Sequence, residues 1–275
     1  MIRSRELMEL KSKDLPPVRS DAGGISLYFL TGKKYLYQTL FCISSLSRVT
    51  QTSFRFVLVD DGSFDDRITA QIARQLPGAQ IFTREMTEKN LNTCLPEQQY
   101  PNLRGKRAVY PHIKKLTDIH TIDPDGWKLV LDSDMLFWDK PAAMLDWLQH
   151  PLAALYMLDC QQSYGYSTQL MEELCGRSIP ALLNVGAIGL NSSQINWNHI
   201  ETWIGTLEAK EGTSYYLEQA LTAMLLAGTE TTILPAGEYI VNPGQPAIQA
   251  AKGVLHHYVD LSKEGYFKTA WKRLI

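Results

Sequence analysis

Residues 128–138 read Lys-Leu-Val-Leu-Asp-Ser-Asp-Met-Leu-Phe-Trp, and this is the most informative stretch of the chain. A short apolar run ends in two carboxylates one residue apart, Asp132 and Asp134, and the chain then becomes apolar again. Alternate residues of a strand point to the same face, so both carboxylates can approach one cation. Hard divalent cations take oxygen ligands and often share a substrate's phosphates. The pattern predicts a buried strand that ends at a metal site for a phosphate-bearing substrate.

The aspartate pair also has a simpler interpretation, because Asp readily bonds its own nearby backbone in turns and caps. The residues that flank the pair include no Gly or Pro that would mark a turn. Charged groups in a buried segment are costly unless they are paired or bind a metal. The flanking sequence therefore favours the metal site.

The composition is that of a globular protein that can bury a large core. Of the 275 residues, 45% are hydrophobic and 20% are charged, and the formal net charge is -2. Nucleic-acid-binding proteins normally carry a basic excess, so no nucleic-acid partner is expected. No apolar run reaches the roughly 18 residues of a membrane helix, so no transmembrane segment is expected.

The cysteines and the start of the chain bear on the compartment. The four cysteines are far apart and show no CxxC or metal-binding spacing, which indicates reduced thiols. The first 20 residues lack the apolar core of a signal peptide. A cytoplasmic protein is expected, with peripheral association at a membrane left open.

Strand-like and helix-like segments alternate through the first half of the chain. Strands are expected at 25–31, 54–59, 79–83 and 127–131, and helices at 35–47, 66–76 and 107–120. Residues 84–104 are expected to be irregular, because Pro96 and Pro101 bracket polar residues. The alternation predicts an α/β protein with a mostly parallel sheet and helices on both of its faces. The second half is less regular, with a strand expected at 152–158 and a helix at 215–226.

Both acidic motifs fall at the carboxyl ends of expected strands. Asp60 and Asp61 follow the strand at 54–59, as Asp132 and Asp134 follow the strand at 127–131. Ligands of parallel α/β sheets bind beyond the carboxyl ends of the strands. The two motifs together therefore predict a ligand site at one edge of the sheet.

These motifs resemble those of glycosyltransferases with the GT-A fold, which move a sugar from a nucleotide-sugar donor to an acceptor. Residues 129–135, Leu-Val-Leu-Asp-Ser-Asp-Met, resemble the DxD motif that binds manganese and the donor diphosphate. Residues 57–63, Val-Leu-Val-Asp-Asp-Gly-Ser, are similar to the family 2 motif whose carboxylates hold the nucleotide base and ribose. The resemblance covers residues 25–260 and implies a Rossmann-like, mostly parallel sheet followed by a less regular acceptor half.

Other segments resemble glycogenin-like family 8 transferases. Lys115 matches their Lys or Arg before the DxD strand, and residues 183–191 resemble their Asn-(Ser/Ala)-Gly segment. Glu218-Gln219 stands where they carry Asp-Gln, and His257 where a His completes the metal site. The Glu in that pair and the tail Val-Asp-Leu-Ser-Lys after Tyr258 depart from the family 8 pattern. The DDGS motif belongs to another family, so the sub-family and the stereochemistry stay open.

The resemblance implies that Asp132, Asp134 and His257 bind Mn²⁺ or Mg²⁺, with His256 as the alternative third ligand. A His nitrogen suits manganese better than magnesium. Contacts to the donor are expected from Thr31, Asp60, Asp61, Lys115, Ser133 and Asn184.

The expected catalytic residues are Glu218 and Gln219. Glu218 would act as a base, a nucleophile or a stabiliser of positive charge at the anomeric centre. A Glu in the first turn of a helix also has a purely structural interpretation, because the helix dipole favours it there. Lys115 would place a point charge on the phosphates, and the adjacent Lys114 competes with it for that role.

The assignments divide the chain into a polar leader at 1–24 and a single GT-A domain at 25–275. Within this domain, residues 25–140 would bind the nucleotide and residues 141–275 the acceptor, which is a carbohydrate, a lipid-linked sugar or a protein. Four aromatic side chains are expected either in an acceptor platform or in the core: Tyr164, Tyr166, Trp197 and Trp203.

The expected function is metal-dependent transfer of a sugar, with a UDP-sugar as donor. One alternative is a haloacid-dehalogenase-like phosphatase with Asp132 as nucleophile, although the Gly-Thr that follows its motif is absent. Another is a non-catalytic protein that binds a nucleotide-sugar. A sugar nucleotidyltransferase is disfavoured, because its Gly-rich loop with Arg-Lys is absent.

Overall fold

The computed structural model describes residues 2–275 and is built around a seven-stranded sheet. The strand order is β3-β2-β1-β4-β7-β6-β8. The strands are β1 (Ile25–Thr31), β2 (Phe54–Asp60), β3 (Gln80–Phe82), β4 (Trp127–Leu131), β6 (Ala154–Leu158), β7 (Leu183–Asn191) and β8 (Thr231–Leu234). Strand β7 runs antiparallel to its neighbours β4 and β6, and the other pairs are parallel. The prediction of a mostly parallel sheet is confirmed.

A second, three-stranded sheet follows directly after β4. It consists of β5 (Met135–Phe137), β10 (Leu255–His257) and β9 (Tyr239–Val241), in that order. The chain leaves the large sheet after Leu131 and enters the small one at Met135. Asp132 and Asp134 therefore lie in the bend that joins the two sheets and not on a strand. The alternation of side chains along a strand, from which we expected both carboxylates to face the same side, does not apply to them.

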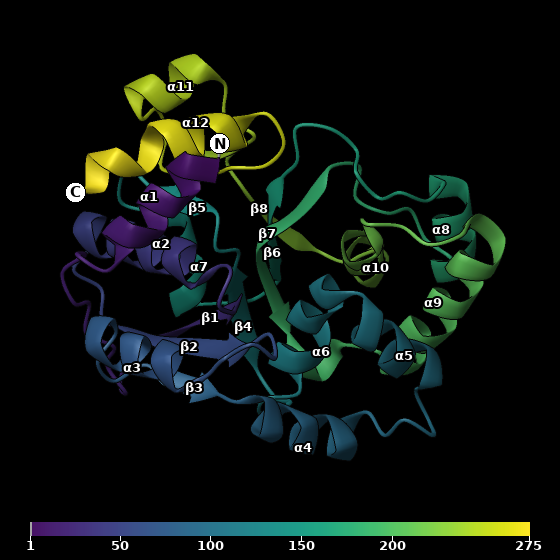
Figure 1. Cartoon of the computed structure of the whole chain (residues 1–275). Coiled ribbons are helices and arrows are strands. Elements are labelled where there is room, and N and C mark those ends of the chain that lie inside the picture. The colour runs from purple at the N-terminus through teal and green to yellow at the C-terminus, as the bar shows by residue number, and fades with distance from the viewer. Residues whose placement is uncertain (1) are drawn as a thin grey trace.

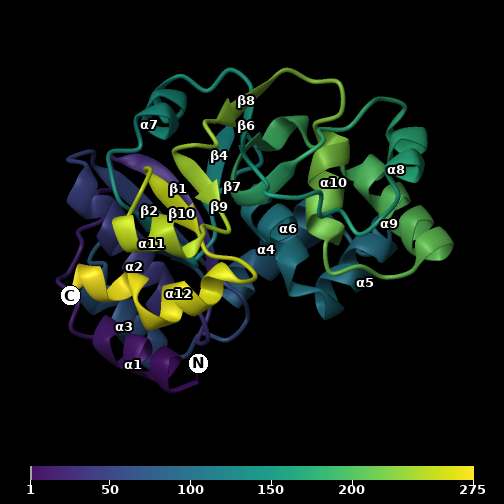
Figure 2. The ribbon, with the colours of Figure 1, turned by 90° about the horizontal axis from the view of Figure 1, so that it is seen from above.

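Helices cover both faces of the large sheet (Figures 1 and 2), as predicted. One core cluster joins the sheet to α1 (Ile2–Ser12), α2 (Leu36–Val49), α3 (Asp66–Gln75), α7 (Ala142–Gln149), α11 (Gln245–Ala250) and α12 (Ser262–Lys268). The other cluster joins it to α4 (Arg84–Cys94), α5 (Pro101–Val109), α6 (Lys114–His120), α8 (Thr168–Cys175), α9 (Trp197–Glu211) and α10 (Leu217–Leu225). Three short 3₁₀ helices are η1 (Pro111–Ile113), η2 (Ser192–Gln194) and η3 (Ala270–Leu274).

Strand β1 shows why the sheet is central. Leu27 and Phe29 enter one core cluster, whereas Tyr28 between them enters the other. Because both faces are covered, the strand reads as a continuous apolar run rather than an alternating one.

Two helix predictions in the first half are wrong. Residues 84–104, expected to be irregular, contain α4 and the start of α5. Thr83 caps α4, and Pro101 lies in the first turn of α5, where a missing N–H is tolerated. The single helix expected at 107–120 is interrupted at Pro111, so α5 ends at Val109 and α6 begins at Lys114.

The polar leader contains helix α1, which packs against α2 and α12. The guanidinium of Arg5 lies 4.5 Å from the centre of the Phe267 ring. Near the other end of the chain, Arg48 donates to the carbonyl of Leu274. The first and last α-helices therefore pack against each other, on the same side of the sheet (Figure 1).

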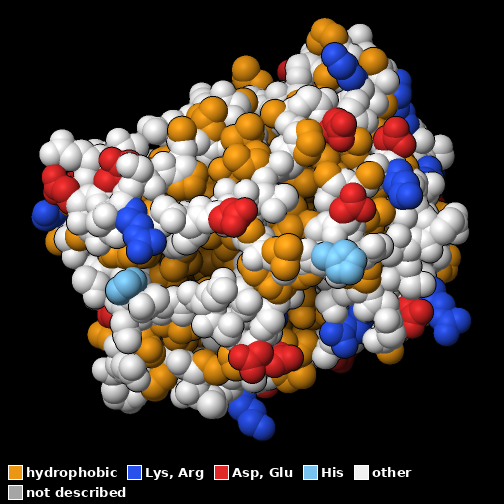
Figure 3. Space-filling view, turned by 180° about the vertical axis from the view of Figure 1, so that it is seen from behind, with side chains coloured by type: hydrophobic (Ala, Val, Ile, Leu, Met, Phe, Trp, Pro, Cys, Tyr) orange, Lys and Arg blue, Asp and Glu red, His pale blue; other side chains and the backbone are white. Residues whose placement is uncertain are grey.

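The surface gives little further evidence about the function. On the face opposite to that of Figure 1, apolar side chains are interleaved with scattered charges of both signs (Figure 3). Among residues 2–275, no helix is long and apolar enough to cross a bilayer.

Candidate functional site

The polar residues of the site gather at one edge of the large sheet. Strands β2, β4 and β6 are followed there by acidic residues, and antiparallel β7 begins at this edge. The small sheet adds a histidine from β10, and α6 and α10 each add charged residues. Residues far apart in sequence therefore meet at the edge where ligands of such sheets bind.

Asp132, Asp134 and His257 form a candidate metal centre. His257 Nε2 lies 3.6 Å from Asp132 Oδ2 and 3.4 Å from Asp134 Oδ1. One ligand atom from each residue lies within 4.8 Å of the other two. An ion at about 2.1 Å from its ligands holds them roughly 3 to 4 Å apart, and the two distances from His257 to the aspartates fall in this range.

Each carboxylate of the pair offers its other oxygen to a lysine. Lys115 Nζ donates to Asp132 Oδ1 at 3.0 Å, and Lys263 Nζ lies 3.6 Å from Asp134 Oδ2. Burial alone would raise the pKa of Asp134, but its hydrogen bond with His257 and the nearby charges lower that pKa. Asp134 is therefore held in the ionised form that a metal requires.

Asn184 and Gly186 orient the His257 ring. His257 Nδ1 lies 3.0 Å from Asn184 Oδ1, which also accepts from the N–H of Gly186. Since an amide oxygen only accepts, Nδ1 carries a proton, and Nε2, on the side of the aspartates, is the nitrogen that would bind a metal. A Cβ on Gly186 would lie 2.4 Å from the His257 ring, so only glycine lets the ring approach the strand.

The neighbouring His256 points elsewhere. Its Nε2 lies 2.6 Å from the carbonyl of Lys252, and its Nδ1 lies 3.1 Å from the hydroxyl of Tyr258. Consecutive residues of a strand face opposite sides, so only His257 can face the bend that holds the aspartates.

Lys115 and Glu218 form a buried ion pair behind the metal centre. Their charged atoms lie 3.4 Å apart, and Lys115 also donates to the carbonyl of Val185. Burial raises the pKa of Glu218 to about 7 despite the nearby ammonium. For Lys115, burial works against the charge, but Asp132 and Glu218 outweigh it and raise the pKa.

Gln219, the residue after Glu218, joins a separate group of amides. Its Nε2 donates to Asp159 Oδ2 at 3.1 Å and to the carbonyl of Ser163 at 2.9 Å. The same Asp159 oxygen accepts from Asn184 Nδ2 at 3.1 Å. Gln219 is thus linked to Asn184, and through it to His257.

Thr31 and Ser133 are connected by a third hydroxyl. Thr39 Oγ1 lies 2.8 Å from Thr31 Oγ1 and 2.9 Å from Ser133 Oγ. The end of β1 is thereby tied to the bend between the two sheets.

Asp60 and Asp61 shape the turn after β2. Asp60 Oδ1 accepts from the N–H groups of Gly62, Ser63 and Phe64, and Asp61 Oδ1 accepts from Ser63. The residue that caps α3 is Asp65 rather than either of these. These bonds show the structural role of both aspartates, whereas contact with a nucleotide stays a prediction.

Lys114 and Gly32 complete this corner of the site. Lys114 donates to the carbonyl of Asp61 at 2.6 Å, so it is bound there while Lys115 reaches Asp132. A Cβ on Gly32 would lie 2.1 Å from the carboxylate of Asp61, so the absence of a side chain at Gly32 leaves the space that this carboxylate occupies.

Of the two interpretations of the four aromatic side chains, acceptor platform or core, the structure supports the core. Tyr164, Tyr166 and Trp203 are buried in the core, and Trp197 is partly buried against it. Exposed aromatic residues lie instead at the start of α10, where Tyr215 is 65% exposed and contacts His112 at 4.8 Å between ring centres. The hydroxyl of Tyr110 joins this cluster to α10, because it donates to the carbonyl of Tyr215 and accepts from the N–H of Glu218.

Sequence reasoning missed Asp159, Lys263 and Thr39. Asp159 directly follows strand β6, so the rule that selected Asp60 and Asp132 could have found it. Lys263 and Thr39 carry no comparable signal, because their role depends on how α12 and α2 pack.

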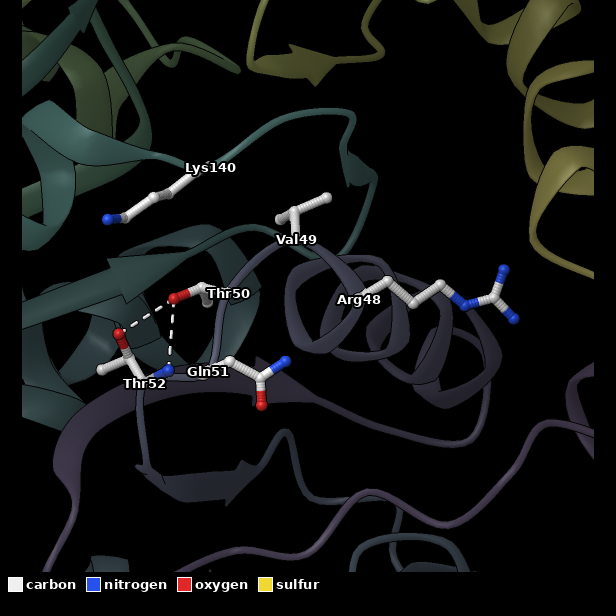
Figure 4. A pocket seen from close by; sticks show the side chains of 6 residues that line it. All are labelled: Arg48, Val49, Thr50, Gln51, Thr52 and Lys140. Carbon is white, nitrogen blue, oxygen red and sulfur yellow. Dashed lines mark hydrogen bonds between the residues drawn. The ribbon is translucent and has the colours of Figure 1, made fainter.

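One open hollow of the surface lies away from this site (Figure 4). It has a volume of about 450 Å³ and is lined by Arg48, Val49, Thr50, Gln51, Thr52 and Lys140. The hydroxyls of Thr50 and Thr52 bond to each other, and Arg48 extends away from Lys140 toward the Leu274 carbonyl. Its polar groups do not converge on a common point.

Comparisons with known proteins bear on the fold. No family model and no curated protein sequence matches the chain. A solved structure of the galactosyltransferase LgtC, in complex with donor and acceptor sugar analogs, matches with a TM-score of 0.61 at 15% identity over 90% of this chain and 94% of that one. Mouse xyloside xylosyltransferase 1 in its apo form matches with a TM-score of 0.57 at 13% identity, over 87% of this chain and 97% of that one.

The apo structure of the bifunctional glycosyltransferase WbbM also matches, with a TM-score of 0.53 at 12% identity. It aligns with 94% of this chain and 52% of that one. At these identities the likeness concerns the course of the backbone. The chain has the GT-A fold of these glycosyltransferases.

Proposed function

We propose that this chain is a metal-dependent glycosyltransferase that moves a sugar from a nucleotide-sugar, with UDP-sugar as the expected donor, to an acceptor hydroxyl. The observation that carries the proposal is the convergence of Asp132, Asp134 and His257 at the ligand-binding edge of a GT-A fold. Two carboxylate oxygens and one imidazole nitrogen form a donor set that suits Mn²⁺.

The bound ion would supply Lewis-acid stabilisation of the charge that develops on a diphosphate leaving group. The residues around it have separate tasks. Lys115 holds one oxygen of Asp132, which leaves Oδ2 on the side of His257. Lys263 lies 40% exposed beside Asp134, where its ammonium can meet a phosphate that arrives from solvent.

Contacts to the nucleoside and the donor sugar are assigned to the remaining residues of the edge. Thr31, Asp60 and Asp61 lie at the ends of β1 and β2, in the half proposed to bind the nucleotide. Ser133 and Asn184 flank the metal centre. The half at 141–275 also contributes to the donor site, because Asn184, Glu218 and His257 come from it.

Glu218 and Gln219 are assigned to the reacting centre. Glu218 is connected to Asp132 through Lys115, and its pKa of about 7 lets the carboxyl group exchange a proton near neutral pH. The exposed cluster of Tyr215 and His112 is assigned to the acceptor, since the apolar face of a sugar ring can pack on an aromatic ring.

The phosphatase alternative has less support. The structural matches are glycosyltransferases, and the third ligand of the candidate centre is a histidine from a distant strand. A non-catalytic protein that binds a nucleotide-sugar would use the same site, so turnover is the property that separates it from the proposed enzyme.

The experiment measures binding and hydrolysis of UDP-, GDP- and dTDP-sugars with and without Mn²⁺. We expect metal-dependent release of the nucleoside diphosphate from one donor, with at least about a thousandfold loss in Asp134→Ala. Asp139→Ala is the matched control, because this exposed aspartate lies five residues further along, beyond β5. Phosphate release from simple monoesters would support the phosphatase, and metal-dependent binding without any turnover would support the binding protein.

A further inference from the structure

Asp159 is a carboxylate beside the metal centre to which the proposed chemistry assigns no role. It directly follows β6, which runs parallel to β4, and therefore lies at the same edge of the sheet as Asp132. Its Oδ1 accepts from the N–H of Cys160, which fixes the side chain on its own backbone. Its Oδ2 accepts from the amide nitrogens of Asn184 and Gln219, each at 3.1 Å.

These contacts determine which way round the Asn184 amide lies. The N–H of Gly186 can only donate, so the atom 2.9 Å from it is the amide oxygen. The Asp159 oxygen accepts in this contact, so the atom that faces it is the amide nitrogen. The two partners act on opposite ends of the same amide and favour the same orientation.

The orientation of Asn184 decides the tautomer of His257. With the amide oxygen 3.0 Å from His257 Nδ1, that nitrogen must carry the proton, and Nε2 is free to bind a metal. If the amide turned over, its NH₂ group would face Nδ1 and favour the tautomer with a proton on Nε2. Asp159 opposes that rotation because the rotated amide would place an oxygen against its carboxylate.

Asp159 orients Gln219 in the same way. One N–H of the Gln219 amide donates to Asp159 and the other to the carbonyl of Ser163. Both donors are thereby used inside the protein, and the amide oxygen is the group left for a substrate.

We propose that Asp159 is a positioning residue that fixes the amides of Asn184 and Gln219 and, through Asn184, the metal-binding tautomer of His257. The link to Gln219 rests on the proposed function. The link to His257 concerns metal affinity alone, so it can be tested without a donor or an acceptor.

The test titrates the apo protein with Mn²⁺ by calorimetry. We expect Asp159→Ala to weaken Mn²⁺ binding about tenfold. This is the lower end of the effect seen when the residues that orient a metal-binding histidine are changed. Asp159→Asn keeps an oxygen acceptor at the same place and is expected to stay within about threefold of wild type. The control Asp139→Ala should bind Mn²⁺ as wild type does.

A double-mutant cycle separates positioning from general stabilisation. Asn184→Ala should weaken Mn²⁺ binding about tenfold in the wild-type background and by less than about twofold when Asp159 is already alanine, because both changes break one chain of contacts. A purely structural role would lower the melting temperature of the apo protein and leave the Mn²⁺ affinity unchanged. Wild-type affinity in Asp159→Ala, or additive effects of the two changes, would overturn the proposal.

The experiment also allows for a variant that does not fold and for failure of the proposed function. If Asp159→Ala does not fold, Asp159→Ser takes its place, because its short side chain cannot reach both amides and the same loss of affinity is expected. If the Mn²⁺ results hold but no nucleotide-sugar is turned over, the role of Asp159 stands and the proposed function fails. If instead a donor is turned over but the Asp159 variants bind Mn²⁺ as wild type does, the proposed function stands and the role of Asp159 fails.

Discussion

Two buried lysines lie near opposite ends of strand β4 and differ in the partners that surround them. At the functional end, Lys115 lies 3.0 Å from Asp132 and 3.4 Å from Glu218, so its ammonium faces two carboxylates. At the far end, the hydrogen-bond acceptors that the described residues give Lys128 are neutral. They are the carbonyl of Asp123 and the hydroxyl of Ser192, each at 2.6 Å.

The difference in partners reverses the effect of burial on the pKa. Burial opposes the charge of both lysines, but the two carboxylates outweigh it at Lys115 and raise its pKa. At Lys128 burial dominates and lowers the pKa to about 8. The functional end of the sheet therefore holds a fixed charge, whereas the far end holds a lysine that can lose its proton under mildly basic conditions.

The largest predicted effect comes from replacing each lysine by methionine. Lys115→Met leaves Asp132 and Glu218 without their shared cation, and the loss of one partner of a buried ion pair costs about 3 to 5 kcal/mol. Lys128→Met leaves two neutral acceptors unpaired, and we expect a smaller loss of about 1 to 2 kcal/mol at pH 7. Urea denaturation of both variants and wild type measures the difference.

Equal destabilisation by the two changes would contradict the comparison, because it would mean that the carboxylates contribute nothing specific. Bound Mn²⁺ must be kept out of this measurement by a chelator, since an ion at the aspartates would itself replace part of the missing charge.

The second prediction concerns pH and follows from Lys128. The unfolded chain keeps this proton up to a pH of about 10.5, whereas the folded protein releases it above about 8, so the unfolded state binds more protons between these values. The free energy of unfolding should therefore rise with pH from about 8 to 10.5, by up to roughly 3 kcal/mol. His120, whose pKa is lowered to about 3 by burial and by Lys128, stays neutral throughout this range.

The measurement compares wild type with Lys128→Met over the same pH range, so that all other titrating groups cancel. The free energy of unfolding of wild type should gain on that of the variant as pH rises. Parallel curves for the two proteins would show that Lys128 keeps an ordinary pKa in the fold.

The degree of burial also explains which parts of the fold could be predicted from the sequence. Strands covered on both faces, such as β1 and β4, are continuous apolar runs that end in charged or turn-forming residues, and their positions were predicted closely. Helices α4 and α5 were missed because few of their side chains are buried, Leu91 and Leu103 among them, and their prolines fall at termini where they do not disrupt a helix. Apolar patterns are informative where burial is complete.

Some residues of the candidate site could be predicted from motifs, and others could not. Asp132, Asp134 and His257 were predicted from motifs and do lie together, although the aspartates are in a bend and not on a strand. Lys263 and Thr39 contact site residues through tertiary packing, which motif spacing along the chain does not encode. The residues that orient the predicted site were therefore harder to find than the site itself.

The third prediction compares two glycines of strand β7. Gly186→Ala would place a Cβ 2.4 Å from the His257 ring, and we expect about tenfold to hundredfold weaker Mn²⁺ binding because this metal ligand is displaced. Gly189→Ala would place a Cβ 2.4 Å from the Trp147 ring, inside the core, and should lower stability by about 1 to 3 kcal/mol without changing metal affinity. Calorimetry with Mn²⁺ and thermal unfolding of both variants test the contrast, and it fails if both changes affect the same property.

The smallest predicted effect compares two serine hydroxyls, one at each end of the sheet. Ser192 accepts from Lys128 and lies 2.8 Å from His120 in a buried cluster, so Ser192→Ala should cost about 1 to 2 kcal/mol through the polar groups that it leaves unpaired. Ser133 bonds Thr39 at the partly exposed bend, where water can replace its hydroxyl, and Ser133→Ala should cost less than about 0.5 kcal/mol.

The order of the two serine variants should reverse for donor binding, which depends on the bend and not on the far end of the sheet. Denaturation curves and donor titrations of the same two variants check both halves, and a Ser192→Ala protein as stable as wild type would show that the far cluster is solvated rather than dry.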